Sequence, residues 1–180
     1  MKATGVIRRV DQLGRIVVPK EIRKTLRLGE GDQSEIFVNR EKEIILKKYS
    51  QIENLSQIAG KCADSLGQVT GHIAVVTDKN KIIAVCGPKR EMQDKPISQE
   101  LEDKINKKES VRAVKDEKNY VSVSPELDPP AAQVIAPIVC EGDPIGSVIL
   151  IPKGNGISIG ETEESLAKCT AAILGKQMEN

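Results

Sequence analysis

Residues 11–19 have the sequence Asp-Gln-Leu-Gly-Arg-Ile-Val-Val-Pro, and this stretch decides how the start of the chain folds. Residues 11–14 are typical of a tight turn, because Asp and Gly are favoured where a chain reverses. Residues 5–10 before the turn and residues 15–18 after it are rich in β-branched side chains, so we expect the two strands of a hairpin. Pro19 suits the start of a helix, where its missing N–H costs nothing.

A short helix and a second hairpin are expected after Pro19. Residues 19–28 place Ile22 and Leu26 one turn apart, and two glycines follow that end the helix. Strands are expected at 35–38 and 43–48, on either side of a turn. A fold of about fifty residues is marginal, because domains near 60 residues bury only about 60% of their unfolded surface. We therefore expect two copies of this segment to interlock in one core.

The charge of the chain divides near residue 50. The whole chain holds 27 Lys+Arg and 26 Asp+Glu, but residues 1–50, which we name the head, hold 12 and 7, a net charge of +5. The remainder, residues 51–180, is the body and has a net charge of −4. A basic head on an acidic body indicates a polyanionic partner for the head alone. Five of the eight basic residues before position 28 are arginine, which favours phosphate and base-edge contacts.

Composition excludes several other functions. The chain has two Tyr, one Phe and no Trp, too few for a protein that stacks single-stranded bases. Its longest apolar run is residues 134–140, whereas a membrane span needs about 20 residues. No apolar stretch follows the N-terminus, so we expect a cytoplasmic protein that contacts no membrane. Four cysteines without C-x-x-C spacing and a single histidine predict no metal site.

The body alternates helices and strand pairs. Its first segment, residues 51–66, has apolar side chains at helical spacing, and Ser98 is a suitable cap for a second helix. We expect helices at 51–66, 98–108 and 160–178, and strands at 73–77, 81–85, 111–114, 120–123, 133–140 and 145–151.

Residues 4–49, which include TGVIRRVDQLGRIVVPKEIRKTL and end in EIILKKY, resemble the AbrB-type swapped-hairpin family of bacterial transition-state regulators. The resemblance implies a dimer whose hairpins interleave into one small β-barrel that binds double-stranded DNA. It implies DNA contacts by the basic residues at four positions, and charge alone adds two more candidates. The four are Arg8, Arg15, Arg23 and Lys24, and the additional two are Arg9 and Arg27.

Residues 136–150, APIVCEGDPIGSVIL, resemble the central hairpin of GAF domains, and the order of elements over residues 56–178 fits that family. The predicted fold is thus α+β, with an AbrB-like domain at 1–53 and a GAF-like sandwich with an antiparallel sheet at 56–178. The GAF resemblance implies either a pocket for an unidentified small ligand or a purely structural, oligomerising body. No cofactor is named. If heads and bodies dimerise separately, a homotetramer follows.

Together these features predict a DNA-binding transcription regulator with activator and repressor roles, and no enzyme. Two alternatives remain. An antitoxin has a similar head but usually carries a disordered acidic tail, which the strand pairs of the body argue against. A thiol-dependent GAF-type enzyme would need a reactive cysteine such as Cys86 or Cys140, and both end apolar strands where a thiol is expected to be inert.

Overall fold

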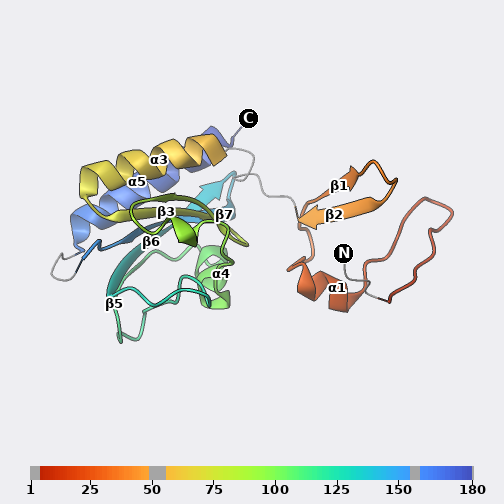
Figure 1. Cartoon of the computed structure of the whole chain (residues 1–180), viewed down its shortest axis with the longest axis horizontal. Coiled ribbons are helices and arrows are strands. Elements are labelled where there is room, and N and C mark those ends of the chain that lie inside the picture. Colours follow the sequence, from red (N-terminus) through yellow and green to blue (C-terminus); the bar gives the residue numbers. More distant parts are fainter. Residues whose placement is uncertain (1–4, 49–55, 155–158, 180) are drawn as a thin grey trace. The chain divides into compact units, whose positions relative to one another are not determined.

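The structure is a computed structural model that describes residues 5–48, 56–154 and 159–179 (Figure 1). The chain divides into two compact units, Met1–Tyr49 and Ser50–Asn180, which coincide with the head and the body to within one residue. The boundary expected between residues 53 and 56 lies outside the described residues, as does the first part of the helix expected from residue 51.

The head contains one short helix and one hairpin. Helix α1 is Lys20–Thr25, and strands β1 (Ser34–Val38) and β2 (Ile44–Lys48) pair antiparallel. The second hairpin is therefore confirmed, but the helix is shorter than predicted. It ends early because Arg27 has a φ of 51°, a left-handed conformation that an α-helix cannot continue.

The first predicted hairpin does not form in the single chain. Residues 5–10 and 15–18 have no strand assignment and flank a turn at 11–15. That turn is closed by backbone hydrogen bonds from Asp11 N to Arg15 O (3.0 Å) and from Gly14 N to Asp11 O (3.0 Å). Strands require a continued ladder of such bonds, and in the described residues the ladder stops at Asp11. The prediction of two strands was wrong for this reason.

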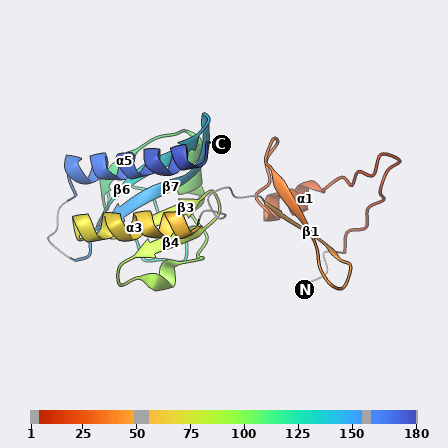
Figure 2. The same cartoon turned by 90° about the horizontal axis from the view of Figure 1, so that it is seen from above.

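A five-stranded sheet forms the centre of the body, in the order β4-β3-β7-β6-β5, with every neighbouring pair antiparallel. Helices α3 and α5 lie side by side on one face, and α4 lies on the other (Figures 1 and 2). The elements are α3 (Ser56–Thr70), β3 (Ile73–Asp78), β4 (Ile82–Cys86), the 3-10 turn η1 (Arg90–Met92), α4 (Gln99–Asn106), β5 (Val111–Val114), β6 (Ala132–Cys140), β7 (Asp143–Ile151) and α5 (Glu161–Gln177).

Residues 120–123 were predicted as a strand and are not one. Val121 and Val123 are buried, but they pack into the core from a loop outside the sheet. The Val121 carbonyl accepts a hydrogen bond from Gln133 Nε2 at 2.7 Å. A side chain of β6 thus satisfies a backbone group that a neighbouring strand would otherwise have to satisfy.

The two faces of the sheet carry different cores. The core under α3 and α5 is rich in alanine, which lets these helices lie close to the strands. At the closest point an added Cβ on Gly175 of α5 would lie 2.1 Å from the Val139 carbonyl oxygen of β6. The opposite core is built mainly from Ile and Val, with Leu101 and Ile105 of α4 fully buried. Ser98 caps α4 as predicted, since its hydroxyl accepts the Leu101 N–H at 3.0 Å.

Local side chains and loops cover part of each edge of the sheet. On β5, Glu117 accepts the Val114 N–H through its carboxylate at 3.0 Å and donates its own N–H to the Val114 carbonyl at 3.1 Å. Asn119 donates to the Arg112 carbonyl at 3.1 Å. On β4, Ile82 exchanges hydrogen bonds with the segment at 94–95. These contacts occupy backbone groups that an edge strand would otherwise present to another chain.

Among the described residues, no helix combines the length and the apolar character needed to cross a membrane.

Candidate nucleic-acid interface

The turn at residues 11–15 holds Arg15 at the tip of the first basic loop. Asp11 Oδ1 accepts the N–H groups of Leu13 (2.9 Å) and Arg15 (2.8 Å), and Asp11 Oδ2 accepts from Arg15 Nε at 2.7 Å. Gly14 has a φ of +77°, which favours glycine at that position. The Arg15 side chain remains 71% exposed, so its terminal nitrogens face solvent. The turn therefore presents a guanidinium group on a braced loop.

Hydrogen bonding at this turn lowers the pKa of Asp11. The largest cause is the backbone N–H of Arg15, followed by the Arg15 guanidinium. The carboxylate is therefore charged at neutral pH, when it orients Arg15. Sequence reasoning treated Asp11 only as a turn residue and missed its positioning role. The signal was present, because an Asp in a turn typically accepts the backbone N–H two residues on, here that of Leu13.

The remaining basic candidates lie on two other segments of the head. Arg8 and Arg9 are exposed in the extended segment before the turn, and Arg8 Nη1 donates to the Ile7 carbonyl at 3.2 Å. Arg23 and Lys24 are exposed on the last turn of α1. Arg27 is half-buried just after the helix. Five of the six candidates therefore have side chains open to solvent, while Arg27 is partly covered.

Large apolar side chains of the head are also exposed. In the β1–β2 register Ile36 lies opposite Leu46 and Val38 opposite Ile44, so these four residues share one face of the hairpin. Ile36, Val38 and Ile44 are 66%, 69% and 66% exposed. No described residue of the head is buried, whereas the body holds two buried cores. The single head is a set of basic and apolar surfaces without a core of its own.

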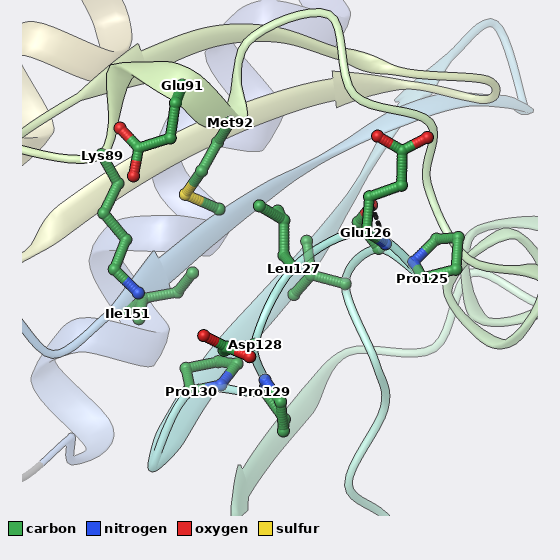
Figure 3. A pocket seen from close by; sticks show the side chains of 12 residues that line it. Lys89, Glu91, Met92, Pro125, Glu126, Leu127, Asp128, Pro129, Pro130 and Ile151 are labelled. Carbon is green, nitrogen blue, oxygen red and sulfur yellow. Dashed lines mark hydrogen bonds between the residues drawn. The ribbon is translucent and has the colours of Figure 1, made fainter.

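The body has a cavity of about 450 Å³ between the segment at 89–92 and the loop at 123–130 (Figure 3). Met92, Val123 and Ile151 line its buried side, and Lys89 and Asp128 line its open side. A salt bridge of 2.7 Å between Lys95 and Glu126 ties the loop to the segment that follows η1. From the sequence, a ligand pocket was one of two alternatives for the body, and none of these lining residues was identified, because no motif marks them.

Three of the four cysteines, Cys62, Cys86 and Cys140, are at least partly buried. Burial is the first cause that raises the pKa of the Cys62, Cys86 and Cys140 thiols, which keeps them protonated at neutral pH. Cys169 is exposed on α5. Within the described ranges, no three His, Cys, Asp or Glu side chains gather as metal ligands would.

Comparisons with known proteins match both parts of the chain. A family model described as "Stage V sporulation protein T C-terminal, transcription factor" matches residues 54–179, and one described as "Antidote-toxin recognition MazE, bacterial antitoxin" matches residues 7–54. Stage V sporulation protein T of Bacillus subtilis (strain 168) is 43% identical over 180 residues, 99% of each chain. Transition state regulatory protein AbrB of the same organism is 47% identical over 72 residues, which are 39% of this chain and 72% of AbrB.

Solved structures match the body in fold. The GAF domain from an Acinetobacter phosphoenolpyruvate-protein phosphotransferase has a TM-score of 0.58 and 12% identity, covering 71% of this chain and 86% of that one. The type II free methionine-R-sulfoxide reductase from Thermoplasma acidophilum has a TM-score of 0.55 and 14% identity, covering 71% and 94%. Identities this low indicate fold and not chemistry. The predicted α+β class and the GAF-like antiparallel sandwich are confirmed.

Proposed function

This chain belongs to the family of stage V sporulation protein T, and on that premise we propose that it is a transcription regulator of sporulation that binds double-stranded DNA as a homo-oligomer. By resemblance it acts late, activating some forespore genes and repressing others. It then works in the cytoplasm, associated with the nucleoid of the forespore.

The observation that carries this proposal is the state of the single head. Three residues of its apolar face, Ile36, Val38 and Ile44, are exposed, Leu46 of the same face is half-buried, and no described head residue is buried. A second head supplies the missing cover if the two interleave, and the extended segments at 5–10 and 15–18 then gain strand partners. Exposed apolar faces of this kind mark association surfaces. The two-fold axis of such a dimer relates two basic clusters, as a duplex site with two half-sites requires.

We assign the DNA contacts to Arg8, Arg15, Arg23 and Lys24, with Arg9 and Arg27 as candidates from charge alone. Helix α1 has only 6 residues, too short for a recognition helix that lies along the major groove. Specificity then depends largely on the shape and flexibility of the DNA. If one dimer neutralises about 6–8 phosphates, log affinity falls with log salt at a slope of about −5 to −7.

The body serves as the second assembly and regulatory module. Val69 of α3 is 74% exposed and Ile173 of α5 is 50% exposed, so the layer formed by these helices has apolar surface beyond its own core. Pairing of two bodies through this layer, together with head dimers, gives a homotetramer. A small ligand in the cavity of the body is the proposed regulatory input, and no cofactor is assigned.

The two alternatives receive less support. The body is a folded sandwich with two cores, unlike the disordered tail of an antitoxin, although the head matches the antitoxin family model. A thiol enzyme needs a thiolate in an electropositive setting, and burial raises the pKa of Cys86 and Cys140 instead. We therefore propose no enzymatic activity.

The proposal is tested by fluorescence anisotropy of labelled promoter duplexes with the full chain over a series of salt concentrations, with sedimentation equilibrium of the same sample. We expect a slope of about −5 to −7 and tighter binding to forespore promoters than to shuffled duplexes of equal composition. A monomer that binds no duplex at low salt would exclude this function.

A further inference from the structure

The cavity of the body has an apolar floor and a charged rim. Met92, Val123 and Ile151 are each 3% exposed and form the floor. Lys89 comes from the segment after β4, and Asp128 comes from the loop that leads to β6 (Figure 3). Because these residues belong to different segments, a molecule in the cavity would contact both walls. A volume of about 450 Å³ is in the range of pockets for small metabolites.

The charges on the two walls are not neutralised by each other. In the part of the chain that the structure describes, neither Lys89 nor Asp128 forms an ion pair, although both line the same cavity. Glu126, in contrast, is engaged with Lys95 at 2.7 Å. Among the described residues, one ammonium group, that of Lys89, and two carboxylate groups, those of Glu91 and Asp128, therefore remain without an ion pair at this cavity. Lys89 and Glu91 belong to one wall and Asp128 belongs to the other, so a molecule between the walls meets the Lys89 ammonium group on one side and the Asp128 carboxylate on the other (Figure 3).

This arrangement selects among ligand classes. The lining residues include one basic side chain and three acidic ones, Glu91, Glu126 and Asp128, which disfavours a phosphorylated ligand. The lining contains no aromatic side chain on which a nucleobase or flavin could stack. A molecule with one carboxylate, one ammonium group and an apolar part satisfies both walls and the floor at once.

We propose that the cavity binds a zwitterion with an apolar side chain, either a free amino acid or a short peptide. Lys89 receives the carboxylate, Asp128 receives the ammonium group, and the apolar side chain packs on Met92, Val123 and Ile151. This inference rests on the proposed regulatory role of the body and specifies the class of ligand. The salt bridge between Lys95 and Glu126 fixes the loop that carries Asp128.

Isothermal titration calorimetry of the full chain tests the proposal with four probes. L-leucine and L-leucyl-L-leucine carry both charges, 4-methylpentanoate lacks the ammonium group, and 3-methylbutylamine lacks the carboxylate. We expect saturable binding of at least one zwitterion. Both single-charge analogues should bind at least about tenfold more weakly than that zwitterion. The two zwitterions distinguish a free amino acid from a peptide. Analogues that bind as tightly as the zwitterions, or zwitterions that do not bind up to about 10 mM, would overturn the proposal.

Substitutions locate the site. Lys89→Met and Asp128→Asn each remove one charge at nearly constant size. Each should lower the affinity for the zwitterion about tenfold or more. Lys118→Met and Asp116→Asn change the same charges at exposed positions outside the cavity and should leave binding unchanged. Unchanged binding in the first pair would refute the site.

Each preparation is also assayed for duplex binding. Duplex binding without zwitterion binding would overturn this inference alone, whereas loss of duplex binding in the wild type would overturn the proposed function.

Discussion

Replacing Ile44 by Ala tests whether a second head covers the apolar face of the β1–β2 hairpin. Ile44 is 66% exposed in the single chain, so a partner can bury about two-thirds of its side chain. Full burial of an isoleucine is worth about 1.5–3 kcal/mol, which makes the partner-dependent part about 1–2 kcal/mol per copy. Both copies carry the substitution, so the dimerised head loses about 2–4 kcal/mol of stability. A head that stayed single would lose almost nothing, because a mostly exposed side chain contributes little.

Amide hydrogen exchange of the full chain measures this effect locally. In the wild type the amides of β1 and β2 should be strongly protected, because opening the hairpin requires separation of the two heads. In Ile44→Ala they should exchange about 30 to 1000 times faster, the factor that corresponds to 2–4 kcal/mol. Val114→Ala removes a comparable 54% exposed side chain from β5 and serves as the control, with no change expected in the head.

A wild-type hairpin that exchanges nearly as fast as an unfolded chain would refute the reasoning. An isolated two-stranded hairpin is at best marginally stable in water, so slow exchange requires something to cover it. Equal protection in the wild type and in Ile44→Ala would show that this face remains open to solvent.

Three further outcomes follow from the contacts described. Arg15→Ala should weaken duplex binding about tenfold or more at fixed salt, and, because a dimer carries two copies of Arg15, the slope of log affinity against log salt should become about two less negative; unchanged anisotropy curves would remove Arg15 from the interface. Gly175→Ala should lower the free energy of unfolding by about 1–3 kcal/mol in urea, because its Cβ would lie 2.1 Å from the Val139 carbonyl. An added Cβ on Gly60 in α3 would meet open space, so Gly60→Ala should raise the free energy of unfolding by about 0.5–1 kcal/mol. Equal effects of the two substitutions would contradict the close approach of Gly175 to the Val139 carbonyl. The Gly160 N–H donates to the Glu163 carboxylate at 2.7 Å, and this bond lowers the pKa of that carboxyl below its usual value of 4.5. The charged carboxylate therefore stabilises the fold at neutral pH, and this stabilisation is lost as the pH falls through the lowered pKa. Glu163→Gln should therefore be less stable than the wild type at pH 7, with a difference that closes in acid, while a constant difference would argue against this linkage.

Most of the body was predictable from local patterns. The β6–β7 hairpin combines two long apolar stretches with a turn that contains Gly142, whose φ of +88° suits glycine. The Ser98 cap also followed from residue type and position alone. In these elements the local preference and the tertiary environment agree, so sequence reasoning and structure agree as well.

The failures occurred where distant parts of the chain decide the outcome. Residues 120–123 have the composition of a strand, yet Gln133 satisfies the Val121 carbonyl from β6, and nothing local indicates this. Lys89 and Asp128 line one cavity although 39 positions separate them, and neither belongs to a motif. The hairpin expected around residue 14 depends on ladder partners that the turn at 11–15 does not supply by itself. Such arrangements are properties of the assembled fold and not of short sequence windows.

The partly covered edges of the body sheet matter for a protein whose proposed activity brings copies of itself together. When several bodies pack closely, the edge strands of neighbouring sheets come near one another. Unpaired edge strands at high local concentration can join into fibrils. Glu117 and Asn119 occupy the outer N–H and C=O of Val114 and the C=O of Arg112 on β5, so this edge offers less template for such growth. Assembly can then end at a defined number of subunits.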